Sequence, residues 1–172
     1  MQLETKRLII KPLAKTDAIE LFAYRSNAEV NKYQGFIPCN LQEVVSFIEK
    51  LPGKFNVSGS WYQLILFEKN SSNVIGDVGI HFFSKKMDSV ELGITISADF
   101  QGKGFAQESL NAVIEELYSK YGKREFTASI DPRNIASKLM LEKLNFTEQS
   151  FTKKAFELRG EWVDDLVYHL HK

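Results

Sequence analysis

The stretch Glu91–Tyr121 reads ELGITISADFQGKGFAQESLNAVIEELYSKY and holds a predicted strand, a glycine turn and a predicted helix in direct succession. β-rich residues fill Glu91–Ile96, and apolar side chains recur at helical spacing over Gln107–Tyr121. The turn Gln101–Ala106 opens straight into the helix. The N–H groups of a first helical turn are free and the helix dipole favours negative charge there. The stretch therefore predicts an anion site, around which the rest of the chain serves as a scaffold.

The composition indicates one globular domain over residues 1–172. Hydrophobic residues make up 44% and charged residues 26% of the chain, and 22 basic and 22 acidic residues give zero net charge. Nucleic-acid and anionic-membrane partners usually need a basic excess, so we expect neither. Cys39 is the only cysteine, and the sequence shows no signal peptide or membrane span. These features predict a cytoplasmic protein, either a monomer or a homodimer.

The N-terminal half predicts a strand, two helices and a meander. The strand is Arg7–Pro12, and Thr16 is the expected N-cap of a helix that runs to Arg25. Asn40 is the expected cap of the second helix. Gly93, inside a later strand, is typical of a bulge or a close backbone approach. The three β-rich runs of the meander are Trp61–Glu68, Val74–Phe83 and Val90–Ile96.

The C-terminal half alternates strands and helices and ends in a hairpin. Gly122 is placed to end the helix of the opening stretch. The later elements are a strand at Glu125–Ile130, a helix at Ile135–Lys143, and hairpin strands at Thr147–Phe156 and Trp162–His171. Together the two halves predict a single-domain α/β (α+β) fold, with a mixed central sheet of about seven strands and helices on both faces.

The turn Gln101–Ala106 can be compared with known phosphate loops. A dinucleotide fingerprint requires glycine three residues after Gly104, where the chain has Gln107. A Walker loop requires glycine five residues before Gly102, where it has Ser97. What remains is Gln-x-x-Gly-x-Ala, whose small residues let a pyrophosphate approach the backbone. Taken alone, the loop fits a tight strand-to-helix connection without a ligand equally well.

Segments along nearly the whole chain accompany the loop in a fixed order. They are ETKRLIIKPL (4–13), IGDVGI (75–80), ELGITIS (91–97), QGKGFA (101–106), NIAS (134–137) with EKLNF (142–146), and RGEWVDDLVY (159–168). In this order they resemble the GNAT superfamily of acetyl-CoA-dependent N-acetyltransferases, and within it the branch of ribosomal-protein N-terminal alanine acetyltransferases. The resemblance implies a GNAT-like fold with the sheet splayed at the cofactor strand, and acetyl-CoA as co-substrate.

The resemblance also implies how CoA binds. The pyrophosphate would lie against the loop amides, and the pantetheine arm would pair with the cofactor strand like an extra strand. Asn134 matches a family asparagine and is also a natural helix N-cap. Lys103 either adds charge near a phosphate or stays solvated. The implied cofactor-binding residues are Ile94, Thr95, Ile96, Gln101, Gly102, Lys103, Gly104, Phe105, Ala106 and Asn134.

Acetyl transfer to an amine needs a neutral amine, a stabilised oxyanion and a proton for the leaving thiolate. A backbone N–H around Ile94–Thr95 suits the oxyanion. Many relatives carry a tyrosine as the acid, but that position is Leu141 here, and the resemblance points instead to the hydroxyl of Ser137. The glutamate base of ribosomal-type relatives is replaced by Phe156, and the neighbouring Glu157 could stand in only if the strand register slips by one. Glu91, acting through water, is the alternative base. Loss of the amine proton to solvent is a further alternative.

We therefore predict an acetyl-CoA-dependent N-acetyltransferase that transfers directly in a ternary complex. The acceptor is a primary amine, either a peptide or protein N-terminus or a small-molecule amine. The three histidines form no metal-ligand grouping, so no metal is expected. The departures at Leu141 and Phe156 keep a different class open, a CoA-binding sensor or interaction protein without turnover.

Overall fold

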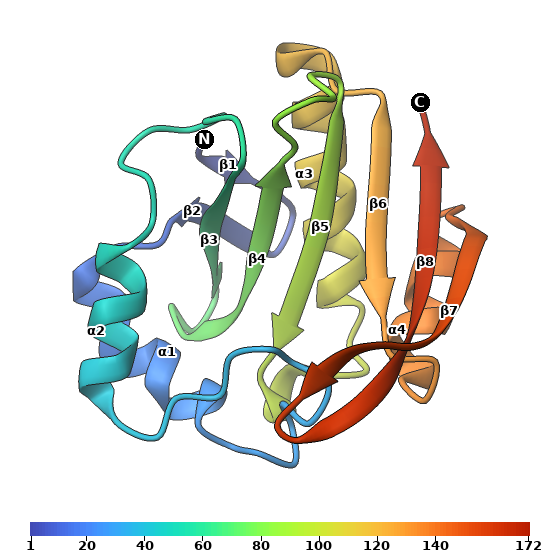
Figure 1. Cartoon of the computed structure of the whole chain (residues 1–172). Coiled ribbons are helices and arrows are strands. Elements are labelled where there is room, and N and C mark those ends of the chain that lie inside the picture. The colour runs from blue at the N-terminus through green and yellow to red at the C-terminus, as the bar shows by residue number, and fades with distance from the viewer.

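The computed structural model describes all 172 residues, and eight strands form one sheet in the order β1-β2-β3-β4-β5-β6-β8-β7 (Figure 1). The expected sheet of about seven strands thus has eight, because a two-residue β1 adds to one edge. The strands are β1 (Leu3–Glu4), β2 (Leu8–Pro12), β3 (Ser60–Glu68), β4 (Val74–Phe82), β5 (Ser89–Ile96), β6 (Glu125–Ile130), β7 (Thr147–Leu158) and β8 (Glu161–His171). The helices are α1 (Ala18–Arg25), α2 (Leu41–Glu49), α3 (Phe105–Tyr121) and α4 (Ile135–Lys143), with short 3₁₀ turns at Lys15–Asp17 and Ala98–Phe100.

The sheet opens between β5 and β6, as expected for a splayed cofactor strand. The two strands are parallel and pair only where Ser89–Glu91 meets Glu125–Thr127. Beyond that point they separate, while β5 stays paired with β4 as far as Ile96. Figure 1 shows the C-terminal end of β5 leading into the start of α3 beside this opening. Backbone groups along one edge of β5 are therefore left for another partner.

The larger core lies behind the sheet in the view of Figure 1, where α3 runs along the sheet behind β5 and β6. Alternate side chains of β4, among them Val78 and Ile80, point to this side and pack with Val113 and Leu117 of α3 in one buried cluster. The front face carries a smaller cluster between α1 and α2, centred on Leu21 and Val44. Helices thus lie on both faces, and the front face beside β4 and β5 stays open.

Two local expectations were wrong. Thr16 does not cap α1: Asp17, which is buried, occupies the N-cap position, and its carboxylate accepts the N–H of Ala14 at 2.9 Å. Gly93 marks no bulge, because the pairing of β4 with β5 is continuous from Gly76 to Phe82. The shifts in register occur instead between β3 and β4 and within the β7–β8 hairpin.

Several expected helix ends are confirmed. The side chains of Asn40 and Asn134 accept the backbone N–H three residues on, at 3.0 and 3.2 Å. Gly122 ends α3 with a left-handed φ of 64°, and the terminal hairpin turns at Arg159 and Gly160. These are local contacts, which is why the sequence predicts them well. None of the helices combines the length and apolar character needed to cross a bilayer.

Candidate functional site

The loop between β5 and α3 presents free backbone donors. Gly102 and Gly104 have φ values of 71° and 79°, in the left-handed region that glycine adopts without strain. The backbone N–H groups from Gly102 to Ala106 have no hydrogen-bond partner within the chain. Gly104 is the N-cap of α3, so these donors point out from the positive end of the helix dipole. The loop has the geometry of an anion cradle.

Arg7, near the N-terminus, contacts this loop and the first turn of α3 through its guanidinium. Its guanidinium donates to the carbonyl oxygen of Lys103 at 2.9 Å, lies 4.1 Å from the ring centre of Phe105, and pairs with Glu108 at 2.6 Å. Burial raises the pKa of Glu108, but hydrogen bonds from Thr5 and Arg7 outweigh it and hold that pKa below its usual value. No pattern in the sequence indicates this role, because Arg7 and Lys103 lie 96 residues apart.

A cavity of about 590 Å³ runs from the loop along β5 to the start of α4. Most of the residues expected to bind CoA line this cavity, and so does Ser137. Lys103 does not line it; its ammonium lies 5.3 Å from the ring centre of Phe100. Glu91 is also outside it, on the front face of the sheet. The expected residues that line the cavity are Ile94, Thr95, Ile96, Gln101, Gly102, Gly104, Phe105, Ala106 and Asn134.

The backbone of β5 turns alternate residues toward the cavity. The carbonyl oxygen of Ile94 accepts the side-chain amide of Gln34 at 3.3 Å, and that of Ile96 accepts the side chain of Gln101 at 2.9 Å. The carbonyl oxygen of Thr95 lies instead against Gly76 on β4. In a strand the N–H and C=O of one residue point to the same edge, so Ile94 and Ile96 face the opening toward β6 and Thr95 does not.

The start of α4 brings a hydroxyl group to the same cavity. The side-chain oxygen of Asn134 accepts the backbone N–H of Ser137 at 3.2 Å and so orients the first turn of the helix. The hydroxyl of Ser137 has no hydrogen-bond partner within the chain and is free to bond a ligand. Leu141, one turn further, is buried in the core and takes no part in the cavity wall.

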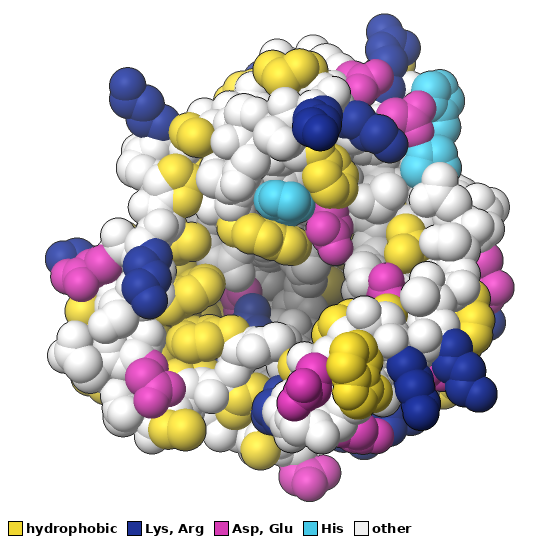
Figure 2. Space-filling model, in the orientation of Figure 1, with side chains coloured by type: hydrophobic (Ala, Val, Ile, Leu, Met, Phe, Trp, Pro, Cys, Tyr) yellow, Lys and Arg dark blue, Asp and Glu magenta, His cyan; other side chains and the backbone are white.

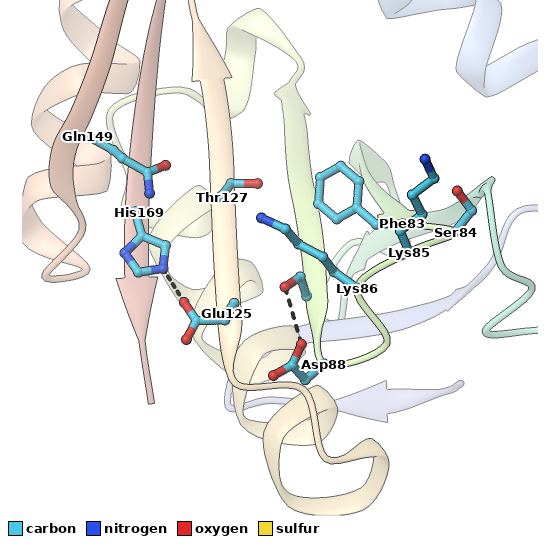
Figure 3. Close-up of a pocket in the computed structure, with 10 residues that line it drawn as sticks. Phe83, Ser84, Lys85, Lys86, Asp88, Glu125, Thr127, Gln149 and His169 are labelled. Atoms are coloured by element: carbon cyan, nitrogen blue, oxygen red, sulfur yellow. Dashed lines mark hydrogen bonds and ion pairs between the residues drawn. The ribbon is translucent and has the colours of Figure 1, made fainter.

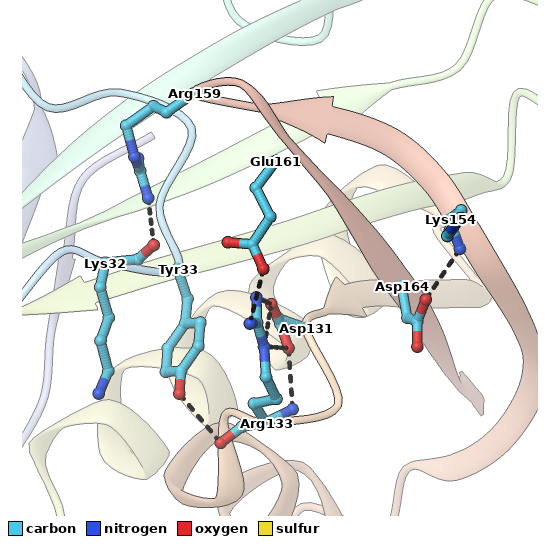
Figure 4. A network of polar contacts seen from close by, with 8 residues as sticks. All are labelled: Lys32, Tyr33, Asp131, Arg133, Lys154, Arg159, Glu161 and Asp164. Carbon is cyan, nitrogen blue, oxygen red and sulfur yellow. Dashed lines mark hydrogen bonds and ion pairs between the residues drawn. The ribbon is translucent and has the colours of Figure 1, made fainter.

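A bridge of polar contacts covers the front of the cavity (Figure 4). Arg159, at the tip of the β7–β8 hairpin, donates to the carbonyl oxygens of Lys32 and Gln34 in the loop between α1 and α2. Tyr33 from the same loop donates to the carbonyl oxygen of Arg133, at 3.2 Å. Three segments far apart in the sequence therefore meet over the opening between β5 and β6.

An ion-pair cluster around Arg133 holds one end of these contacts in place. Arg133 contacts Asp131 at 2.6 Å and Glu161 of β8 at 3.1 Å. Hydrogen bonds from Arg133 hold the pKa of Asp131 below its usual value. The turn between β6 and α4 is therefore fixed to the C-terminal hairpin, next to the residues that begin α4.

The front face of the sheet forms a second cleft, hollowed in the centre of Figure 2 and rimmed by hydrophobic side chains and a histidine. Trp61, His81 and Glu91 lie side by side on β3, β4 and β5. The rings of Trp61 and His81 stack with centroids 5.0 Å apart, and Nδ1 of His81 is 3.5 Å from the Glu91 carboxylate. Burial raises the pKa of Glu91, and the nearby His81 opposes that shift.

A buried ion pair lies deeper on this face. Asp77 of β4 is fully buried and bonds Arg25 of α1 through both carboxylate oxygens, at 3.0 and 2.6 Å. It also accepts the hydroxyl of Tyr24 at 2.6 Å and the side-chain amide of Gln63 at 3.0 Å. Burial, together with the charge of Asp77, raises the pKa of Tyr24. The network joins α1 to the sheet beside the cleft, and no sequence pattern indicated it.

Another hollow, of about 530 Å³, lies at the start of β5 and β6 (Figure 3). Lys85 and Lys86 of the β4–β5 turn border it, and Glu125 at its side contacts His169 and His171. Its side chains leave no buried polar atom without a partner. No cluster of three or more His, Cys, Asp or Glu side chains is placed to hold a metal ion.

Comparison with known proteins agrees with the geometry of the loop and cavity. The family model described as an acetyltransferase (GNAT) domain matches residues 7–147. The chain belongs to the GNAT acetyltransferase family. As a GNAT protein it is an N-acetyltransferase, and the family uses acetyl-CoA.

Among relatives of this GNAT protein, an uncharacterised N-acetyltransferase of Bacillus licheniformis, p20, is 24% identical over 170 residues, covering 99% of this chain and 96% of the relative. The [ribosomal protein uS5]-alanine N-acetyltransferase of Escherichia coli is 23% identical, covering 97% and 89%. The crystal structure of spermidine N-acetyltransferase from Vibrio cholerae with CoA and spermine has a TM-score of 0.83 at 17% identity, covering 97% and 96%. The shared fold spans nearly the whole chain.

Proposed function

We propose that this protein transfers the acetyl group of acetyl-CoA directly to a primary amine, either a peptide or protein N-terminus or a small-molecule amine. The observation that carries the proposal is the run of free N–H groups from Gly102 to Ala106, which opens on a cavity that also holds the hydroxyl of Ser137. An anion cradle and a proton donor at two ends of one cavity suit a pyrophosphate and a leaving thiolate.

The chain offers a match for each part of CoA. The loop amides suit the pyrophosphate, and the exposed edge of Ile94 and Ile96 suits the amides of the pantetheine arm. Gln34 now donates to the carbonyl oxygen of Ile94, so its side chain must move aside before pantetheine can pair there. The relatives named for ribosomal protein and for spermidine support an amine as acceptor without choosing between the two kinds.

In the proposed reaction the neutral amine nitrogen attacks the thioester carbonyl carbon, a C–N bond forms, and the C–S bond breaks. The amine loses a proton to Glu91, through His81 or water, and the thiolate gains one from the hydroxyl of Ser137. Ser137 then regains a proton from solvent as Glu91 releases its own to solvent. The backbone N–H of Ile94 points into the opening and suits the oxyanion. The products are an N-acetyl amide and CoA with a free thiol.

The assay is release of the CoA thiol when acetyl-CoA is mixed with N-terminal peptides or with spermidine. Transfer to at least one primary amine is expected, and the acetylated product identifies the acceptor. Binding of acetyl-CoA without transfer would favour the alternative function, a CoA-binding protein without turnover. The buried Leu141 at the family's tyrosine position is consistent with that alternative. Failure to bind acetyl-CoA would contradict the proposal.

Replacing Ser137 by alanine (Ser137→Ala) should lower turnover by roughly 100-fold, the usual effect of losing a general acid. The Asn134 cap bonds the backbone of residue 137 and survives the change, so CoA affinity should stay the same. Steady-state kinetics with calorimetric titration of CoA measures both quantities. An unaltered turnover number would remove the hydroxyl from the mechanism.

Replacing Glu91 by glutamine (Glu91→Gln) should lower turnover and yet stabilise the fold at neutral pH. Burial raises the pKa of Glu91 in the folded state, so its ionised form destabilises the protein above that pKa. As the pH falls below the unfolded-state pKa, the carboxyl is protonated in both states and the difference should vanish. Urea unfolding at pH 7.5 and pH 4 tests this, with Glu49→Gln in an exposed ion pair as control. A loss of stability at pH 7.5 would contradict it.

A further inference from the structure

Buried polar atoms without partners gather on the front face of β3, β4 and β5. Four side-chain atoms in the whole chain are buried without a hydrogen bond, and three of them belong to Gln63, His81 and Thr95. One of these three, Nδ1 of His81, has a charged neighbour, the Glu91 carboxylate at 3.5 Å. The strand register places all three residues on this face, around the cleft. Unpartnered buried polar atoms are costly, so we expect a bound water or a ligand to complete them.

Two glycines make the floor of the cleft. Gly79 and Gly93 are cross-strand neighbours on β4 and β5 and lie on the same face as the unpartnered atoms. A Cβ at Gly79 would lie 2.7 Å from Oε1 of Gln63 and 3.1 Å from the Trp61 ring, so these side chains already cover Gly79. A Cβ at Gly93 would meet nothing within 4 Å. The free space in the floor is therefore above Gly93.

The atoms around that space define the group it can hold. Nε2 of Gln63 donates to Asp77, which orients Oε1 as an acceptor over Gly79, one strand or about 5 Å from Gly93. Glu91 lies two residues along β5 on the same face, with its carboxylate 3.5 Å from His81. Burial raises the pKa of Glu91, and the negative charge of Asp165 is near enough to add to that shift. Oε1 of Gln63 and the Glu91 carboxylate are hydrogen-bond acceptors on two sides of this space. A ligand that fits between them has two separate donor groups, and the one at the carboxylate is cationic.

We propose that the acceptor amine binds above Gly93, with its primary ammonium against Glu91 and a second N–H or O–H donor against Oε1 of Gln63. This inference rests on the proposed acetyl transfer and names the acceptor class: an amine with a second donor close by, as in the α-ammonium and first peptide N–H of a peptide N-terminus. The stacked ring of Trp61 forms the apolar wall. The position is next to the opening between β5 and β6, where the thioester would lie.

Filling the space tests the location. Gly93→Val should raise the acceptor KM at least about tenfold and leave CoA affinity within about twofold. Residue 93 lies in a strand and does not have a positive φ, so valine fits the backbone there. Gly53→Val is the matched control, because a Cβ at Gly53 also meets nothing within 4 Å and lies outside the cleft. An unchanged acceptor KM in Gly93→Val would overturn the proposal.

Two peptides test the second donor. We expect Ala-Ala-Ala amide to be acetylated with a kcat/KM about tenfold above that of the same peptide N-methylated at its first peptide bond. Gln63→Leu should abolish this preference, and a ratio between two acceptors is independent of how much protein is folded. No preference in the natural protein, or a preference retained in Gln63→Leu, would overturn the proposal.

A binding measurement separates this inference from the proposed function. In a Trp162→Phe background the fluorescence of Trp61 reports directly on the cleft, and the two peptides can be titrated with CoA present. The same preference in binding without any acetyl transfer would contradict the proposed function and support this site. Binding of neither peptide would overturn the site.

Discussion

Replacing Gly104 by glutamate (Gly104→Glu) should raise the dissociation constant for CoA at least about 100-fold, a loss of ~2.8 kcal/mol. Gly104 has a φ of 79° and is the N-cap of α3, in the middle of the free N–H groups. A side chain there is strained by roughly 1–2 kcal/mol, and its carboxylate repels the anion that the loop is built to hold. Isothermal titration with CoA measures the effect.

Gly122→Glu is the matched control for that experiment. Gly122 lies at the other end of the same helix, also with a positive φ, of 64°. A Cβ at Gly122 would meet nothing within 4 Å, and one at Gly104 would meet only the Arg7 guanidinium, at an ordinary contact distance of 3.6 Å. The strain of the substitution is therefore comparable, while the anion loop is untouched. Unfolding curves of both variants should shift, but only Gly104→Glu should lose CoA. Equal CoA affinity in the two variants would disprove the loop assignment.

Replacing Asp77 by alanine (Asp77→Ala) should destabilise the fold by about 3–5 kcal/mol, the usual cost of breaking a buried ion pair. Arg25, which is 7% exposed, would keep its charge with no partner inside the protein. Tyr24 and Gln63 would each lose a hydrogen bond as well. Urea unfolding monitored by circular dichroism gives the free energy of unfolding.

Two further variants show whether the buried charge is the cause. Adding Arg25→Met to Asp77→Ala removes the isolated guanidinium and should recover part of the stability. Glu49→Gln, which breaks the exposed pair with Lys15, should cost less than about 1 kcal/mol. A loss below 1 kcal/mol in Asp77→Ala itself would show that the network contributes little to the stability of the fold.

The elements that sequence analysis predicted well are those made by contacts between near neighbours. The helix cap at Asn134, the end of α3 at Gly122 and the glycine loop before α3 each depend on residues within one or two helical turns. The wrong cap at Thr16 has the same local character, because the neighbouring Asp17 occupies the N-cap position, is buried and accepts the N–H of Ala14. Local chemistry limits which residues can cap a helix but does not always select one of them.

The sequence by itself determined the strand, glycine loop and helix that make an anion site, because spacing and backbone freedom along the chain fix them. Only the tertiary structure decided which groups meet at that site. Arg7 reaches the loop, Gln34 reaches the edge of β5, and Gln63 places an unpartnered oxygen over Gly79, each through contacts between different strands or loops. Such contacts depend on strand order and register, which the packing of the whole sheet sets and no short pattern in the chain encodes.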